Sequence, residues 1–378
     1  MDTHDQKQEM EHRLTQETDS PGFMAPDAPM GPGLLELANG AAATLPPEVE
    51  ITPEGEVKPK KSPTPLQDSL RRLRRDKLAM VSLGVIIFLV VIPIIGPFLY
   101  QHIGPPYQSS LNGTIGPGLY HNPFHQELDH QDEFISGQYW LGTDAIGRDL
   151  LARLMQGLLV SLSVALMVEI VDIGLGVLVG VLAGFFGGWI DQLLARFTDI
   201  MFAFPGLLFA ILLTGIFGTQ ADVVFSSIPL IGGNGNARLI LVSLALSITA
   251  WPLMARYVRG QTLQLKEQQF VEAARTSGTT NARIIMRHIV PNLFSIVVVA
   301  STLNIANTVI GEAGLSLLGL GVQQPGSSLG LMISDAIGLI DTHPWEVLLP
   351  ALVLTMVVLA FSFLGDGLRD AFDPRSKD

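Results

Sequence analysis

The sequence predicts an all-α membrane protein that crosses the bilayer six times and begins with a disordered tail. Hydrophobic residues make up 48% of the 378 residues and charged residues only 15%, with a mean hydropathy of +0.39. Soluble domains carry about 25% charged residues. Several apolar runs approach the roughly 20 residues that a helix needs to span the hydrocarbon core. Cysteine is absent, so no disulfide framework and no thiolate metal site is expected.

The first 65 residues differ in composition from the rest. They hold 12 acidic and 5 basic side chains, so they carry −7 of the net charge of −12. They are also rich in proline and glycine and poor in aromatic residues, a composition that cannot bury enough apolar surface to fold. We therefore expect residues 1–65 to be a disordered acidic cytoplasmic tail and not a secretory signal, because the start lacks a basic and an apolar region. A regulatory role and a dispensable extension both remain open.

Residues 66–77 are predicted to form a short cationic amphipathic helix. Leu66, Leu70 and Leu73 fall on one side of it. The other sides carry Arg71, Arg72, Arg74, Arg75 and Lys77. Such a helix is expected to lie on the cytoplasmic membrane surface, where anionic lipid headgroups balance its charge. Nucleic-acid binding is not expected, because the first membrane span follows at once.

Charge counting gives the expected topology. The six spans are expected at 78–100, 158–186, 197–218, 238–258, 292–310 and 345–364. If both termini are cytoplasmic, only Arg148, Arg153 and Arg238 of the 23 basic residues lie outside, which leaves 20 inside. Without the tail's five the ratio is still 15 to 3, as the positive-inside rule requires. The segment 187–196 is then a tight cytoplasmic turn, and 219–237 an outer loop.

The first extracytoplasmic segment, 101–139, contains three histidines among carboxylates. His121, His125 and His130 could bind a divalent metal ion. The pair Asn122–Pro123, however, argues against a long helix that would align them. We therefore expect a solvated loop and assign no metal site.

The stretch 270–294 is a polar, cationic segment between two apolar runs. Glu272 falls in the first turn of a short predicted helix, where a carboxylate is favourable. Gly278 is placed to end that helix in a left-handed conformation, and a threonine after it can cap a second helix. Pro291 is expected to bend the chain as it enters the next span.

This pattern resembles the EAA loop of ABC importer permeases. The matching residues are Glu272, Ala273, Ala274, Gly278 and Pro291. In that family the loop is the coupling helix, which docks into a groove on a separate ATPase subunit, and its alanines let it seat deeply. An ordinary amphipathic cytosolic hairpin is the alternative.

Three further segments extend the resemblance. Residues 140–157 (WLGTDAIGRDLLARLMQG), 311–325 (GEAGLSLLGLGVQQP) and 364–375 (LGDGLRDAFDPR) are similar to runs of the C-type permease subunit of dipeptide/oligopeptide/nickel ABC importers. The resemblance implies the type I importer permease fold, with residues 66–157 as amphipathic helix, first span and extracytoplasmic loop, and 158–378 as the permease core. The glycines of 311–325 suit irregular or re-entrant backbone. We expect it to form part of the outer gate, with a packed extracellular loop as the alternative.

The resemblance also implies partners. Such a permease pairs with a homologous second permease, two ATP-binding cassette ATPase subunits and an extracytoplasmic substrate-binding protein. No phosphate-binding loop, nucleophile elbow or H-E-x-x-H pair appears in the sequence. We therefore expect no enzyme activity and no cofactor in this chain, with ATP bound by the partners. Peptides are the expected cargo, and nickel chelates or oligosaccharides are the alternatives.

Two features of the second span depart from a plain apolar helix. Gly176, Gly180 and Gly184 recur every four residues and form a face for close helix approach, either within this chain or against a second permease. Glu169 and Asp172 share one face, and a charge at the bilayer centre costs roughly 2.5–3.5 kcal/mol. They are expected to face protein or water. They could line the translocation path, form a structural pair, or carry protons in a secondary transporter.

Overall fold

The computed structural model describes residues 65–225, 227 and 237–372. Among these residues, six helices are long and apolar enough to cross a membrane. They are α4 (Lys77–Tyr100), α6 (Leu150–Phe186), α8 (Gly206–Phe225), α9 (Ala237–Leu265), the run Asn281–Leu317 that ends in α12 (Phe294–Leu317), and α14 (Pro344–Phe372). The predicted all-α membrane fold with six spans is confirmed. The predicted tail lies outside the described residues except for Pro65, the first residue of the first helix below.

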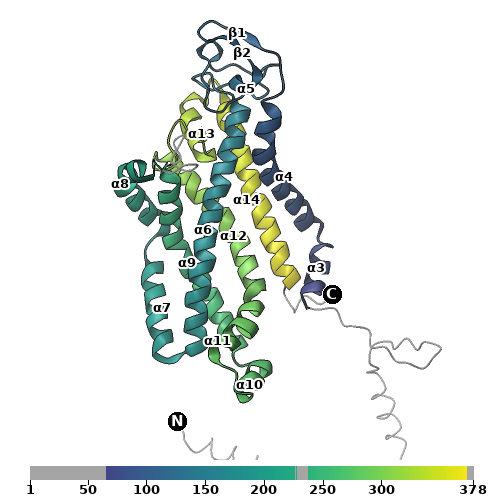
Figure 1. The fold of residues 1–378 in the computed structure, drawn as a ribbon, viewed down its shortest axis with the longest axis vertical. Helices are drawn as coiled ribbons and strands as arrows, with labels where there is room; N and C mark the ends of the chain where they lie inside the picture. Colours follow the sequence, from purple (N-terminus) through teal and green to yellow (C-terminus); the bar gives the residue numbers. More distant parts are fainter. Residues whose placement is uncertain (1–64, 226, 228–236, 373–378) are drawn as a thin grey trace, which may run out of the picture. The chain divides into compact units, whose positions relative to one another are not determined.

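Shorter elements connect the spans. They are α3 (Pro65–Leu73), β1 (Tyr107–Ser109), β2 (Gly113–Ile115), α5 (Pro117–Tyr120), η2 (Leu128–His130), α7 (Gly188–Ala203), α10 (Gln269–Thr276), α11 (Asn281–Ile284), the π-helical η3 (Ile285–Ile289), η4 (Val290–Leu293), α13 (Leu329–Ala336) and η5 (Ile337–Leu339). β1 and β2 form an antiparallel hairpin. The hairpin and α10 lie at opposite ends of the spanning helices (Figure 1).

The long helices α6 and α9 pack closely through the glycine face of α6. A Cβ added to Gly180 would lie 2.6 Å from the carbonyl oxygen of Ala255, so nothing larger than hydrogen fits there without movement. Gly176 and Gly184 meet the neighbouring turns of α9 in the same way. The glycine face therefore packs within this chain, which decides the alternative that the sequence left open.

The prediction for the third span was wrong at both ends. The chain turns at Gly187 and Gly188, which have φ of +67° and +57°, and α7 begins at once, so 187–196 is mostly helix and not a turn. Phe204 is extended because it precedes Pro205, and a proline disfavours helical backbone at the residue before it. The predicted span 197–218 is thus split there, and α8 crosses instead.

Other boundaries also moved. Asp149 caps α6 by accepting hydrogen bonds from the N–H groups of Leu151 (2.8 Å) and Ala152 (3.1 Å), so the capped helix and the second span are one element. The predicted outer loop 219–237 is helical up to Phe225. The expected irregular backbone at 311–325 starts only after Leu317. Gly311 and Gly314 stay helical because a glycine costs only about 1 kcal/mol in a helix, less than its buried neighbours contribute, whereas Gly319 has a left-handed φ of +73° in the irregular part.

The amphipathic helix is shorter than predicted. It ends at Leu73, because Asp76 caps α4 and accepts a hydrogen bond from the N–H of Leu78 at 2.9 Å. Leu73 is buried against Ala79 and Ala371 near the end of α14. One part of its apolar side therefore contacts protein, whereas Leu70 remains exposed.

The first extracytoplasmic segment is a packed unit and not the solvated loop that we expected. Ile115, Tyr120 and Tyr139 are each at most 1% exposed and form its core, with Tyr107 packed against them. Aromatic residues this large supply enough apolar surface to order the hairpin and its turns. The unit sits over the ends of the spans that lie opposite α10 (Figure 1).

Candidate functional site

The helix α10 presents the predicted coupling motif at one end of the spanning helices (Figure 1). Glu272 and Ala273 are exposed, and Glu272 lies in the first turn as expected. Ala274 is partly buried and packs against the chain's own apolar cluster. A partner can therefore reach the methyl group of Ala273, whereas Ala274 contributes mainly to internal packing.

Val271 is the fully buried residue that packs α10 against the membrane helices. Val271 is fully buried in a cluster that contains Val181 and Phe185 of α6 and Val258 of α9. The guanidinium of Arg275 also lies 5.5 Å from the ring of Phe185. Val271 and Arg275 therefore join α10 to the ends of both long helices.

The turn after α10 depends on Gly278. Its φ of +74° is left-handed, and its N–H donates to the carbonyl of Arg275 at 2.9 Å. The N–H of Thr279 donates to Ala274 at 3.1 Å. The predicted glycine-ended helix is confirmed. Thr280 occupies the N-cap position of α11 but makes no side-chain hydrogen bond there.

The chain then enters the fifth span through irregular helix. It passes from α11 through the π-helical η3 and the 3₁₀ helix η4, which contains the exposed Pro291, before α12 begins. Proline has no N–H for the helical ladder, so the pattern of hydrogen bonds changes around it. Sequence reasoning missed two exposed apolar side chains in this region, Phe270 (41%) and Met286 (69%). An apolar residue in an otherwise polar segment was the available signal.

The two carboxyl groups of the second span point to one partner helix. Asn304 of α12 donates its amide hydrogens to Glu169 (3.0 Å) and to Asp172 (3.1 Å). Glu169 is 4% exposed and Asp172 is 2% exposed. This arrangement fits the structural pair that the sequence analysis left open. A place on the translocation path stays a prediction.

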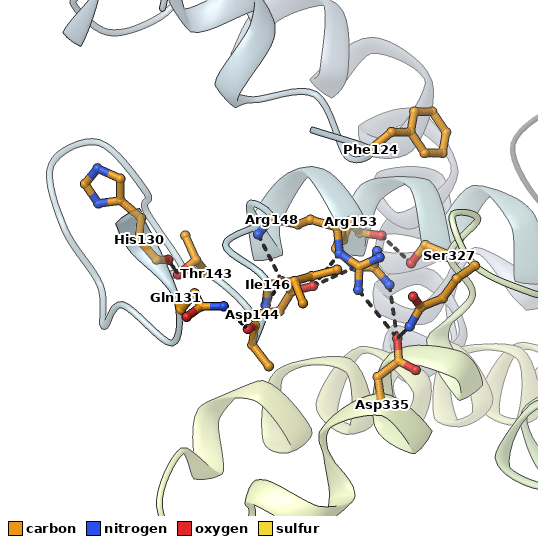
Figure 2. A network of polar contacts seen from close by, with 12 residues as sticks. Phe124, His130, Gln131, Thr143, Asp144, Ile146, Arg148, Arg153, Ser327 and Asp335 are labelled. Carbon is orange, nitrogen blue, oxygen red and sulfur yellow. Dashed lines mark hydrogen bonds and ion pairs between the residues drawn. The ribbon is translucent and has the colours of Figure 1, made fainter. Parts of the chain in front are cut away.

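Two of the motifs meet at the end of the spans opposite α10, where Figure 2 shows their polar contacts. Arg148 donates from Nε to Asp144 at 2.7 Å. Arg153 lies with Nη2 3.4 Å from Asp335 of α13. Gln324 donates to the same carboxylate at 3.0 Å. Ion pairs and a hydrogen bond therefore join the segments 140–157 and 311–335. No spacing pattern in the sequence indicates this contact.

A buried carboxyl group adds a second connection nearby. Glu312 is fully buried near the end of α12 and accepts hydrogen bonds from Ser161 of α6 (2.8 Å) and Ser316 (2.7 Å). Ser316 lies within hydrogen-bond distance of Ser328 just before α13. Sequence reasoning gave Glu312 no role, although a lone carboxyl in an apolar run was a signal for a buried polar network.

The three extracytoplasmic histidines do not meet at one point. His121 contacts Asp149, His125 contacts Glu127, and His130 contacts Glu133. Each histidine pairs with a carboxylate of its own. Burial by itself raises the pKa of Glu127, but hydrogen bonds from Ser109, Asn112 and nearby groups outweigh it and hold that pKa below its usual value.

Comparison with known proteins places these features in a family. Residues 176–378 match the model for the binding-protein-dependent transport system inner membrane component, and 64–130 match the N-terminal TM domain of oligopeptide transport permease C. The glutathione transport system permease protein GsiD of Escherichia coli O6:K15:H31 (strain 536 / UPEC) is 36% identical over 321 residues, which cover 85% of this chain and 94% of that protein. The dipeptide transport system permease protein DppC of Bacillus subtilis (strain 168) is 35% identical over 310 residues, which cover 82% of this chain and 85% of that protein.

A solved structure is also similar. It shows inward facing conformations of the MetNI methionine ABC transporter, is 21% identical, covers 59% of this chain and 96% of that chain, and has a TM-score of 0.45.

Six apolar helices and a polar segment exposed at one end define a multi-pass membrane protein of the transport type. The family match covers more than half of the chain, and its relatives align over most of their length. The chain belongs to the family of binding-protein-dependent transport system inner membrane components. It is thus a permease subunit of an ABC importer, as the resemblance predicted.

Proposed function

We propose that this chain forms half of the membrane passage of a peptide importer. The movement of the ATPase subunits reaches this chain through α10. The passage is completed by a homologous second permease. Two ATPase subunits bind on the cytoplasmic side, and an extracytoplasmic binding protein delivers the cargo. Both termini then lie in the cytoplasm of a prokaryotic cell.

The observation that carries the proposal is the geometry of α10. Glu272 and Ala273 are exposed at its surface, while Val271 holds the same helix in the cluster of α6 and α9. An ATPase that binds the exposed side can therefore move both spans. Orientation follows from charge: the segment 270–294, which contains α10, holds three arginines and one glutamate, and the segment 65–77, which contains α3, holds five basic and two acidic residues. Basic residues favour the cytoplasmic side.

Peptides are the proposed cargo because the similar permeases are named for glutathione and dipeptide transport. Nickel chelates and oligosaccharides are the alternative cargos for a permease of the same family. Mass spectrometry of ligands that co-purify with the cognate binding protein distinguishes them. Recovery of peptides supports the proposal, and recovery of a sugar or a metal chelate contradicts it.

The coupling role is tested with charge reversal in the assembled transporter. Glu272→Arg is expected to leave the complex folded but to reduce cargo-stimulated ATP hydrolysis at least tenfold, because it places a cation in the docking surface. Gly278→Asp is expected to do the same by straining the left-handed turn. Glu267→Arg, an equal change at an exposed position before α10, is the matched control. Unchanged stimulation in Glu272→Arg would remove α10 from the docking surface.

The same assay decides the alternative class. A secondary transporter driven by protons through Glu169 and Asp172 would move cargo without ATPase subunits and would respond to a proton gradient. The proposed importer requires ATP and its partner subunits. Uptake by this chain alone in proteoliposomes would overturn the proposal.

A further inference from the structure

A cluster of three side chains lies at the outer end of the sixth span, away from α10 and from the pair in the second span. Asp132 comes from the extracytoplasmic unit, whereas His343 and Glu346 come from the start of α14. One ligand atom from each lies within 4.8 Å of the other two. His343 follows Asp132 by 211 positions, so no spacing pattern in the sequence reveals the group.

One carboxyl oxygen of Glu346 is buried without a hydrogen-bond partner among the described residues, and the group lies within hydrogen-bond reach of Asp132. The residue is 2% exposed, and its Oε1 has no hydrogen-bond partner among the residues that the structure describes. Within the same described residues, Oδ1 of Asp132 is also buried and unpaired. Buried polar atoms are almost always satisfied, so two unpaired oxygens beside a histidine indicate a missing positive group.

The local charge gives the same indication. A cavity of about 160 Å³ next to the cluster is lined by Asp144, Arg148, Arg153, Asp335 and Glu346. Three carboxylates and two guanidinium groups line this cavity, and Asp132 adds a fourth carboxylate beside Glu346, so carboxylates outnumber guanidinium groups by two. A divalent cation would balance this difference, and no other cationic side chain lines that cavity.

We propose that Asp132, His343 and Glu346 bind a divalent transition-metal ion, with zinc as the best match. An imidazole nitrogen with two carboxylates is a ligand set that zinc accepts, whereas calcium and magnesium prefer oxygen ligands alone. Three protein ligands leave a fourth position for water.

The surroundings of His343 favour a ligand role. Its Nδ1 lies 3.1 Å from the hydroxyl of Thr342, which can fix the ring and leave Nε2 for the metal. The ring centroids of Phe134 and Trp345 also lie 4.8 Å apart. Phe134 is close in sequence to Asp132, and Trp345 stands between His343 and Glu346. This ring contact holds the extracytoplasmic unit against the start of α14 without a metal ion. A bound ion would add a second link between the same two segments.

Metal binding is tested on the full transporter in lipid nanodiscs, stripped with EDTA and dialysed against buffered ZnCl₂. Zinc per complex is counted by plasma mass spectrometry in the presence of excess MgCl₂ and CaCl₂. We expect His343→Ala and Glu346→Gln each to bind one zinc fewer than the wild type, or to bind it at least about tenfold more weakly. Asp341→Asn and His102→Ala, exposed residues on the same side, are controls expected to match the wild type.

X-ray absorption gives a second readout. The wild-type spectrum is expected to contain a histidine nitrogen at about 2.0 Å that His343→Ala removes. Because His343 is only partly buried, that variant keeps the test valid even if Glu346→Gln fails to assemble. Equal zinc in the wild type and His343→Ala, absence of zinc in the wild type, or displacement by calcium or magnesium would each overturn the proposal.

Discussion

Arg153 and Asp335 lie 3.4 Å apart, although 182 positions separate them in the sequence. Arg153 is 1% exposed at the outer end of α6, and Asp335 is a partly exposed residue of α13. Their contact joins the motif 140–157 to α13, which follows the motif 311–325 (Figure 2). Charged side chains therefore join the helices at the end of the spans opposite α10, whereas apolar packing around Val271 joins them at the end near α10.

A double-mutant cycle measures this contact. Arg153→Met and Asp335→Asn are each expected to destabilise the protein, because each leaves the other charge with fewer partners. The double variant is expected to be about 1–2 kcal/mol more stable than the sum of the single changes, the range for residues in contact. Thermal and denaturant unfolding of the assembled transporter give the free energies. Additive effects would show that the pair makes no net contribution.

The close approach of α6 and α9 is tested with alanine at two glycines of the same helix. Gly180→Ala is expected to destabilise the protein by about 1–3 kcal/mol, because the added Cβ overlaps Ala255 and Val258. Gly174→Ala is the matched control, since a Cβ there meets nothing within 4 Å. That change is expected to be neutral or slightly stabilising. Equal effects at the two positions would contradict the packing.

The amide of Asn304 is expected to stabilise the carboxyl pair in the second span. Asn304→Leu removes the donor to Glu169 and Asp172, so it is expected to destabilise the protein by about 1–3 kcal/mol. In the background Glu169→Gln with Asp172→Asn the same change is expected to have a smaller effect. Uptake is measured in parallel. If the double carboxyl variant transports every cargo at the wild-type rate, the pair has no place on the translocation path.

The lowered pKa of Glu127 predicts that acid reduces the stability of the extracytoplasmic unit. The pKa of Glu127 is lowered in the folded state, so its contribution is complete above the unfolded value and is lost as the pH falls through the folded value. We expect Glu127→Gln to lower stability by about 1–3 kcal/mol at pH 7 and the difference to shrink below about pH 4.3. Thermal unfolding between pH 7 and 3 measures this. A constant difference would contradict it. Glu133→Gln, a partly exposed position, is the control.

The sequence predicted the parts of the fold that depend on local chemistry. Apolarity located the six apolar runs, although several ends moved and the third span is α8 and not 197–218. The left-handed Gly278 was placed correctly because the turn needs that backbone. The errors came from what apolarity does not measure. Helices α9 and α14 extend beyond the hydrocarbon core, and Pro205 divided a run that hydropathy treats as continuous.

The site was predicted only where its residues are close in sequence. Glu272, Ala273 and Gly278 lie within one helix and its turn, so a short pattern was enough to predict them as coupling residues, and that role stays a prediction. The partners Asn304, Asp335 and Glu346 lie far along the chain from the groups they approach. Burial of Ala274 by the chain's own cluster also depends on tertiary packing and has no local signature.

The absence of native cysteine allows the most direct test of the coupling role. Ala273→Cys places a single thiol on the exposed side of α10, and Gly137→Cys places one on the extracytoplasmic unit, where a Cβ meets nothing within 4 Å. A short thiol-to-amine cross-linker is applied to the assembled transporter, and the products are identified by mass spectrometry. We expect Ala273→Cys to join this chain to an ATPase subunit and Gly137→Cys not to. A failure of Ala273→Cys to reach the ATPase, in a complex that still hydrolyses ATP on addition of cargo, would contradict the proposed docking at α10.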